Sequence, residues 1–197
     1  MKTEEELIWE AYNPGSEAKE EEDYGCLMVY LDGSTAEEIK RYCQETFNPE
    51  ILADFGIEDE PHITCQYGFH GDVTPEEITD FVSKIKKPIE IELGEISRFD
   101  NDEYDVIKVD VNSKDLRDLS DKIREHFKDR LEITFPNYHP HMTLAYVQKG
   151  TLPHIDGDSM FSGKNHTFDE FVYSDANEEK YDIQKNLDKL KKNKTNW

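Results

Sequence analysis

Two histidine-threonine pairs are the residues of this chain best suited to chemistry. His62-Ile63-Thr64 and His141-Met142-Thr143 each lie in an apolar, strand-like run, and one residue separates the members of each pair. Side chains alternate across a strand, so the histidine and the threonine of a pair are predicted to project from the same face. Two imidazoles and two hydroxyls brought to one cleft would form an acid-base site suited to a phosphodiester.

Histidine suits both proton-transfer roles in such a reaction. Its ordinary pKa of about 6.5 populates the acid and the base near neutral pH. One histidine would remove the proton from an attacking ribose 2′-OH, and the other would protonate the departing oxygen, which gives a 2′,3′-cyclic phosphate without a metal. The threonine hydroxyls would donate to the non-bridging oxygens. The sequence leaves open which histidine is the acid and which is the base.

The elements that must position the two pairs follow a repeated order. Apolar or alternating runs predict strands at 25–32, 62–69, 89–99, 104–111 and 138–147, and helical spacing with capping residues predicts helices at 34–46, 74–86 and 112–128. Ser34 or Thr35 is expected to cap the first helix. The runs 166–174 and 179–184 are expected to add edge strands. This order predicts two related halves, each contributing one motif strand to a shared cleft.

The composition divides the chain into three parts: an acidic N-terminal extension (1–24), one domain (25–184) and a basic tail (185–197). No run approaches about 18 apolar residues, and no basic start precedes an apolar leader. The three cysteines lack metal-ligand spacing and suit a reduced compartment. We therefore expect a cytoplasmic protein with no membrane partner, no cofactor and no metal. The oligomeric state is left open.

The net charge of −22 limits the class of partner. Proteins that bind long nucleic acids usually carry a basic stripe, and this chain has none in its body. The charge therefore argues against polymeric DNA or RNA and leaves small nucleotides as partners, although solubility alone would also explain it.

The segments around the two pairs resemble the 2H phosphoesterase superfamily, which is named for two His-x-Thr/Ser motifs. The matching segments are 61–69 (Pro-His-Ile-Thr-Cys-Gln-Tyr-Gly-Phe) and 138–147 (Tyr-His-Pro-His-Met-Thr-Leu-Ala-Tyr-Val). The resemblance spans about residues 25–148. It implies a bilobal α+β fold, in which two antiparallel sheets flank a central cleft and the helices lie outside. It also implies catalytic roles for His62, Thr64, His141 and Thr143, usually without metal.

The residues that follow the motifs, Tyr-Gly-Phe-His and Leu-Ala-Tyr-Val, are similar to those of phage-encoded members. Some of these members are anti-CBASS phosphodiesterases, which degrade the cyclic oligonucleotide signals of bacterial immunity. The resemblance therefore implies a hydrolase of 3′–5′ bonds in small cyclic oligonucleotides, acting in the host bacterial cytosol. A 2′,3′-cyclic phosphodiesterase, a 2′–5′ RNA-ligase-like enzyme and a non-catalytic nucleotide-binding sponge remain as alternatives.

Five further residues are candidates for substrate contact. Tyr67, Phe69 and Tyr146 could stack on a base, although aromatic residues on strands usually belong to a core. Trp197 could close over a nucleotide, unless the tail is only a solubilising terminus. His139 has the parity of His141, but the intervening proline favours a loop position. The two histidines would also suit zinc, but no further ligand of suitable spacing is nearby.

Overall fold

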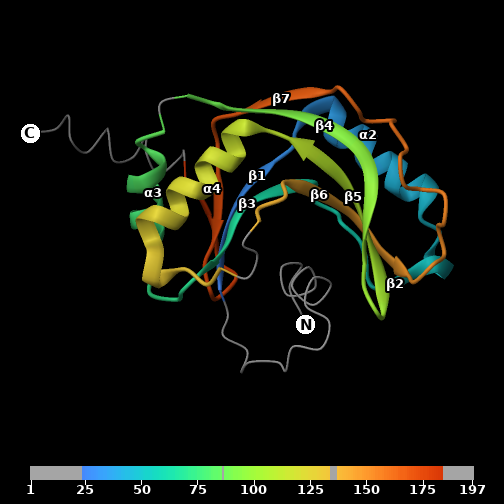
Figure 1. The fold of residues 1–197 in the computed structure, drawn as a ribbon, viewed down its shortest axis with the longest axis horizontal. Helices are drawn as coiled ribbons and strands as arrows, with labels where there is room; N and C mark the ends of the chain where they lie inside the picture. The colour runs from blue at the N-terminus through green and yellow to red at the C-terminus, as the bar shows by residue number, and fades with distance from the viewer. Residues whose placement is uncertain (1–23, 86, 134–136, 184–197) are drawn as a thin grey trace, which may run out of the picture.

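Two antiparallel sheets form the framework of the computed structural model (Figure 1). The structure describes residues 24–85, 87–133 and 137–183. Strands follow the order β3-β1-β8-β9 in the four-stranded sheet and β2-β6-β5-β4-β7 in the five-stranded sheet. The larger sheet curves into an arch, and the helices lie on its outside and beside the smaller sheet. This is the α+β architecture with two antiparallel sheets that the resemblance implies.

The elements have the following bounds. The strands are β1 (Gly25–Tyr30), β2 (Leu52–Ile57), β3 (His62–Phe69), β4 (Ile89–Asp100), β5 (Tyr104–Asn112), β6 (His141–Gln148), β7 (Asn165–Phe168), β8 (Val172–Ser174) and β9 (Lys180–Asp182). The helices are α2 (Gly33–Thr46), α3 (Pro75–Val82) and α4 (Lys114–Phe127), with 3-10 turns at η1 (Pro49–Ile51) and η2 (Lys128–Arg130). All five strands and all three helices predicted within 25–147 are present.

Capping explains where the helices begin. Thr74 and Glu77 form a reciprocal capping box at α3, and the Ser113 hydroxyl accepts from a backbone N–H in the first turn of α4. The start of α2 differs from the prediction. Its N-cap is Asp32, and the helix begins at Gly33, whose φ of +63° favours glycine, so the expected capping residues lie inside the helix.

The structure corrects three predicted boundaries. Strand β6 begins at His141 and not at residue 138, and α3 ends at Val82 and not at residue 86. The run 166–174 forms two strands in different sheets: β7 is an edge of the larger sheet, whereas β8 lies between β1 and β9. Strand β2 was not predicted. It pairs irregularly with β6 and is interrupted by Gly56 at φ +70°, which explains its weak pattern.

Both faces of the larger sheet are buried near its centre. Leu116, Leu119, Ile123 and Phe127 of α4 join the main core on the outer face of the sheets. A second apolar cluster (Tyr104, Val106 and Tyr146, with Ala53, Phe55 and Phe99 packed against it) covers the opposite face. By strand register this is the face that carries His141 and Thr143. We call the face of each sheet that carries a His-Thr pair its motif face.

Within the described residues, the helices are too short to cross a membrane. The two longest, α2 and α4, have 14 residues each, against the roughly 20 that a bilayer requires.

Candidate active site

A β-bulge follows the threonine of each motif. In the β1/β3 pair the register moves from Leu27↔Gln66 to Met28↔Thr64, so Cys65 is the extra residue. In the β5/β6 pair it moves from Ile107↔Ala145 to Lys108↔Thr143, so Leu144 is the extra residue. A bulge bends its strand and redirects the side chains beyond it. The two halves therefore repeat the same local geometry, which the sequence alone did not reveal.

The two histidines are held by equivalent hydrogen bonds. The Nδ1 of His62 lies 2.9 Å from the carbonyl oxygen of Glu60, and the Nδ1 of His141 lies 2.8 Å from that of His139. A carbonyl oxygen can only accept, so Nδ1 carries the proton in both rings. In the neutral ring Nε2 is then the basic nitrogen, and in the charged ring it is an acid. Both imidazoles are thus oriented for proton transfer through Nε2.

A tyrosine connects the two motifs. Strands β3 and β6 belong to different sheets, yet they contact each other near the centre of the molecule (Figure 1). Tyr138, three residues before His141, donates its hydroxyl to the carbonyl oxygen of Thr64 at 2.6 Å. Burial raises the pKa of Tyr138 well above its ordinary value, so the phenol stays a donor. This bond joins the approach to one motif to the threonine of the other.

The threonines differ in their surroundings. Thr143 is 2% exposed, and its hydroxyl has no hydrogen-bond partner among the described residues. The Thr64 hydroxyl has a weak contact, 3.9 Å from the Cys26 thiol. A buried hydroxyl without a partner costs about 1–3 kcal/mol, and a phosphate oxygen on the motif face would accept from it.

A buried lysine stands opposite the second motif. Lys108 on β5 pairs with Thr143 in register, and the next residue on that face, Asp110, pairs with His141. The Lys108 ammonium donates to the Ser97 hydroxyl at 2.6 Å, forms an ion pair with Asp110 and lies 4.3 Å from the centre of the Phe99 ring. Sequence reasoning missed this residue. A lysine at the centre of a strand, between the apolar residues Ile107 and Val109, was the signal that could have found it.

The first motif has different neighbours. Tyr30 on β1 pairs with His62 in register, and the two ring centres are 5.4 Å apart. Lys180 on β9 binds the carboxylate of Glu60 at 2.8 Å and lies 5.4 Å from the centre of the Tyr30 ring. Glu60 also supplies the carbonyl that holds His62, so β9 is connected to the first motif through this ion pair.

The remaining candidates for substrate contact lie in different parts of the fold. Phe69 is fully buried in the main core against Phe127 and Tyr173, so it packs the core instead of facing a ligand. Tyr146 is buried in the second apolar cluster on the motif face. Tyr67 is partly exposed, with its ring 5.8 Å from that of Tyr24.

Two further candidates lie outside regular strands or outside the described residues. His139 precedes β6 and is exposed, and its carbonyl, not its ring, holds His141. His139 therefore lies in a loop, as the proline at position 140 predicts. Trp197 and the rest of the basic tail lie outside the described residues, as does most of the N-terminal extension.

Within 24–85, 87–133 and 137–183, no group of three or more His, Cys, Asp or Glu side chains is arranged to hold a metal ion.

Comparison with solved structures supports the fold. TT0787 of Thermus thermophilus is 14% identical, covers 82% of this chain and 98% of its own, and superposes with a TM-score of 0.59. E. coli LigT complexed with 3′-AMP is 15% identical over 81% of this chain and 92% of its own, with a TM-score of 0.57. Kluyveromyces marxianus Usb1 with uridine monophosphate is 12% identical over 82% and 98%, with a TM-score of 0.53. These identities are low, so the similarity concerns the fold alone.

The sequence comparison is more specific. No curated protein matches the sequence. A family model described as the 2′-5′ RNA ligase superfamily matches residues 36–155, which include both His-Thr pairs and more than half of the chain. This protein therefore belongs to the 2′-5′ RNA ligase superfamily.

Proposed function

We propose that this protein is a metal-independent phosphodiesterase that cleaves 3′–5′ bonds of small oligonucleotides. Membership in a superfamily of phosphoesterases supports a hydrolase of this kind. The observation that carries the proposal is the equivalent fixing of two imidazoles. Each Nδ1 is bound by the carbonyl two residues earlier, and each histidine precedes a threonine and a bulge. A binding pocket alone would not require this repetition.

The proposed reaction uses both histidines in one displacement. The neutral ring removes the 2′-OH proton through Nε2, and the O2′–phosphorus bond forms as the phosphorus–O5′ bond breaks. The charged ring gives its Nε2 proton to O5′, so the products are a 2′,3′-cyclic phosphate and a 5′-hydroxyl. In a second step the two histidines exchange roles. One removes a proton from water as the water attacks phosphorus, and the other protonates O2′ as the phosphorus–O2′ bond breaks, which opens the cyclic phosphate. Acid-base assistance of this kind contributes about 10²–10⁴ in rate.

The surroundings of the histidines suit the charge that develops on phosphorus. The hydroxyls of Thr64 and Thr143 lie on the motif faces as donors for the non-bridging oxygens. The ammonium of Lys108, opposite Thr143, adds positive charge on the same face. These roles make the site complementary to an anionic transition state inside an otherwise acidic protein.

The net negative charge of the chain favours a small substrate over a polymeric one. A net charge of −22 repels a long polyanion, whereas a compact nucleotide meets mainly the local field of the site. We include cyclic oligonucleotide signals in this class because the residues after the motifs resemble phage-encoded enzymes that degrade them. Counter-defence against bacterial immunity is then the proposed biological role.

The test is a cleavage assay in EDTA with cyclic di- and trinucleotides, linear 3′–5′ dinucleotides and 2′,3′-cyclic nucleotides. We expect new products from the oligonucleotides, none from a 2′-deoxy dinucleotide, and at least a 10²-fold loss in His62→Asn and His141→Asn. His154→Asn is the matched control, because His154 is exposed and outside both motifs.

Three results would contradict the proposal. Recovery of every ligand intact after denaturation would indicate a sponge. Turnover of 2′,3′-cyclic nucleotides alone would indicate the narrower cyclic phosphodiesterase. Loss of turnover in EDTA would exclude the metal-independent mechanism.

A further inference from the structure

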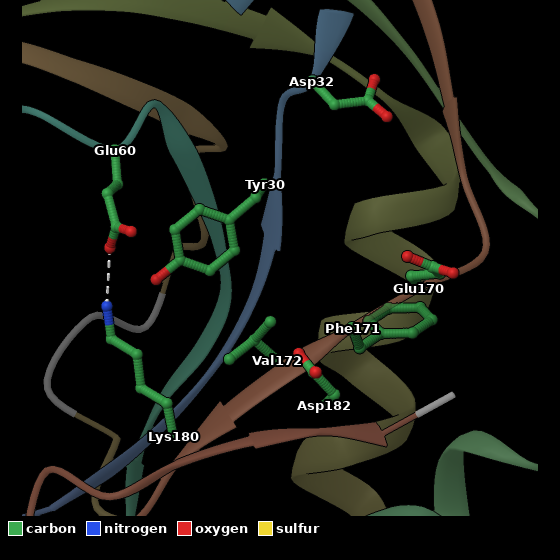
Figure 2. Close-up of a pocket in the computed structure, with 8 residues that line it drawn as sticks. All are labelled: Tyr30, Asp32, Glu60, Glu170, Phe171, Val172, Lys180 and Asp182. Atoms are coloured by element: carbon green, nitrogen blue, oxygen red, sulfur yellow. Dashed lines mark hydrogen bonds and ion pairs between the residues drawn. The ribbon is translucent and has the colours of Figure 1, made fainter. Parts of the chain in front are cut away.

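A cavity of about 360 Å³ lies beside the first motif (Figure 2). Its volume is within the range of ligand pockets, roughly 300–1,000 Å³. Tyr30 and Val172 contribute apolar surface to it, and Glu60, Lys180 and Asp182 contribute polar groups. The sequence singled out none of these residues, and the proposed reaction uses none of their side chains; it uses only the backbone carbonyl of Glu60, which holds His62.

The cavity opens on the motif face of the smaller sheet. Tyr30 is the register partner of His62, and Val172 is the register partner of both Met28 and Asp182. Tyr30, Met28 and Val172 therefore share one face with the first motif. Because the Tyr30 and His62 rings are 5.4 Å apart, a group stacked on Tyr30 would lie beside His62.

The charges around the cavity disfavour a second phosphate. Among the described residues that line it, Lys180 is the one cation, and its ammonium already binds Glu60 at 2.8 Å and lies near the Tyr30 ring. The other charged lining groups are all carboxylates: Asp32, Glu170 and Asp182. A ligand here must therefore offer N–H or O–H donors and a surface that packs on Tyr30 and Val172.

A nucleobase has these two properties, and guanine fits a carboxylate best. Its N1–H and its 2-amino group are neighbouring donors, which match the two oxygens of one carboxylate. Adenine and cytosine place a ring acceptor beside their amino group, and uracil offers one N–H between two carbonyls. Stacking on an aromatic ring is similar for every base, so the carboxylate decides the preference.

We propose that this cavity is a subsite for the nucleobase next to the scissile phosphate, that Tyr30 stacks on the base, and that Asp182 selects guanine. The inference rests on the proposed function for its place in the reaction, but the binding itself can be measured without turnover. Asp182 is chosen among the described lining carboxylates because it lies on a strand, β9, where its register with Val172 places it on the same face as Tyr30. The ion pair between Lys180 and Glu60 lines the subsite beside Tyr30 (Figure 2), and the backbone carbonyl of Glu60 holds His62.

The binding test uses guanosine, inosine and adenosine 3′-monophosphates with the wild-type protein, followed by calorimetry. Guanosine monophosphate should bind about tenfold or more tightly than adenosine monophosphate, because a good bidentate pair discriminates to this degree. Inosine monophosphate, which lacks the 2-amino group, should lie between them. Asp182→Asn should remove the preference, and Tyr30→Leu should weaken all three.

Asp121→Asn is the matched control, because it removes the same charge from an exposed position on α4. It should leave the order of affinities unchanged, and thermal unfolding should show that each variant is folded. Equal affinity for the three nucleotides, or an unchanged preference in Asp182→Asn, would overturn the subsite.

Cleavage of GpU, UpG, ApU and UpA separates this proposal from the proposed function. Cleavage without a guanine preference would reject the subsite and retain the phosphodiesterase. A guanine preference in binding, with no cleavage of any substrate, would retain the subsite and reject the phosphodiesterase.

Discussion

Replacing Lys108 with methionine should reduce activity while it leaves stability nearly unchanged. The Lys108 side chain is 7% exposed, and its ammonium binds Ser97 and Asp110 beside the Phe99 ring. Burial of an ammonium costs several kcal/mol, and methionine fills a similar volume without that cost. The groups left behind stay satisfied, because the Ser97 hydroxyl still donates to Asp110 at 2.9 Å and the Asp110 side chain is 50% exposed. We expect the free energy of unfolding to change by no more than about 1–2 kcal/mol.

The effect on activity follows from the position of the charge opposite Thr143. At about 6 Å from a phosphate, with an effective dielectric constant of about 20, a unit charge contributes about 3 kcal/mol. Asp110 neutralises part of this field. A remaining contribution of about 1–2 kcal/mol corresponds to a fall in kcat/KM of roughly 5- to 30-fold.

The assay combines urea unfolding with kcat/KM on a 3′–5′ dinucleotide. Lys164→Met is the matched control, since Lys164 is also paired with a carboxylate, Glu38, and also lies near an aromatic ring, that of Phe161. Its kcat/KM should be unchanged. An activity of Lys108→Met within twofold of wild type would refute the electrostatic role. A loss of more than about 3 kcal/mol in stability would show that the lysine is structural.

Three further predictions concern the framework. Tyr138→Phe should lower the free energy of unfolding by about 1–3 kcal/mol and reduce kcat, because the carbonyl of the first motif loses its donor; urea unfolding and turnover measure both. Gly68→Ala should be among the most destabilising substitutions, because Gly68 has φ +102° and an added Cβ would lie 2.1 Å from the carbonyl oxygen of Glu132; a fall of more than about 3 kcal/mol is expected, and a normal thermal midpoint would contradict it. Hydrogen bonds from Arg130 and from the Thr74 backbone lower the pKa of Glu77 from 4.5 to about 2, so these contacts stabilise the fold above pH 4.5 and lose their contribution as the pH falls towards 2. Glu77→Gln should therefore flatten the acid part of the stability curve, and an unchanged acid slope would argue against a role for the Glu77 carboxylate.

Much of the fold was predictable because its signals are local. The capping box at Thr74 and the cap at Ser113 marked the starts of α3 and α4, and alternation marked the β4-β5 hairpin. Strand β2 escaped prediction because its pairing with β6 is irregular and non-local. The run 166–174 was assigned to edge strands, but β8 lies inside the smaller sheet, and no local pattern encodes which strands flank it.

The sequence by itself determined the candidate site and its setting: two His-x-Thr motifs on strands, an acidic body and an α+β order of elements. These depend on residue type and on a period of two, which a strand imposes without reference to the rest of the chain. Tertiary structure decided what surrounds the motifs. It set the bulge after each threonine, the bond from Tyr138 to the opposite motif, and the places of Lys108 and Tyr30. These depend on cross-strand register between segments distant in sequence, and register is fixed only when both faces of the sheets are packed.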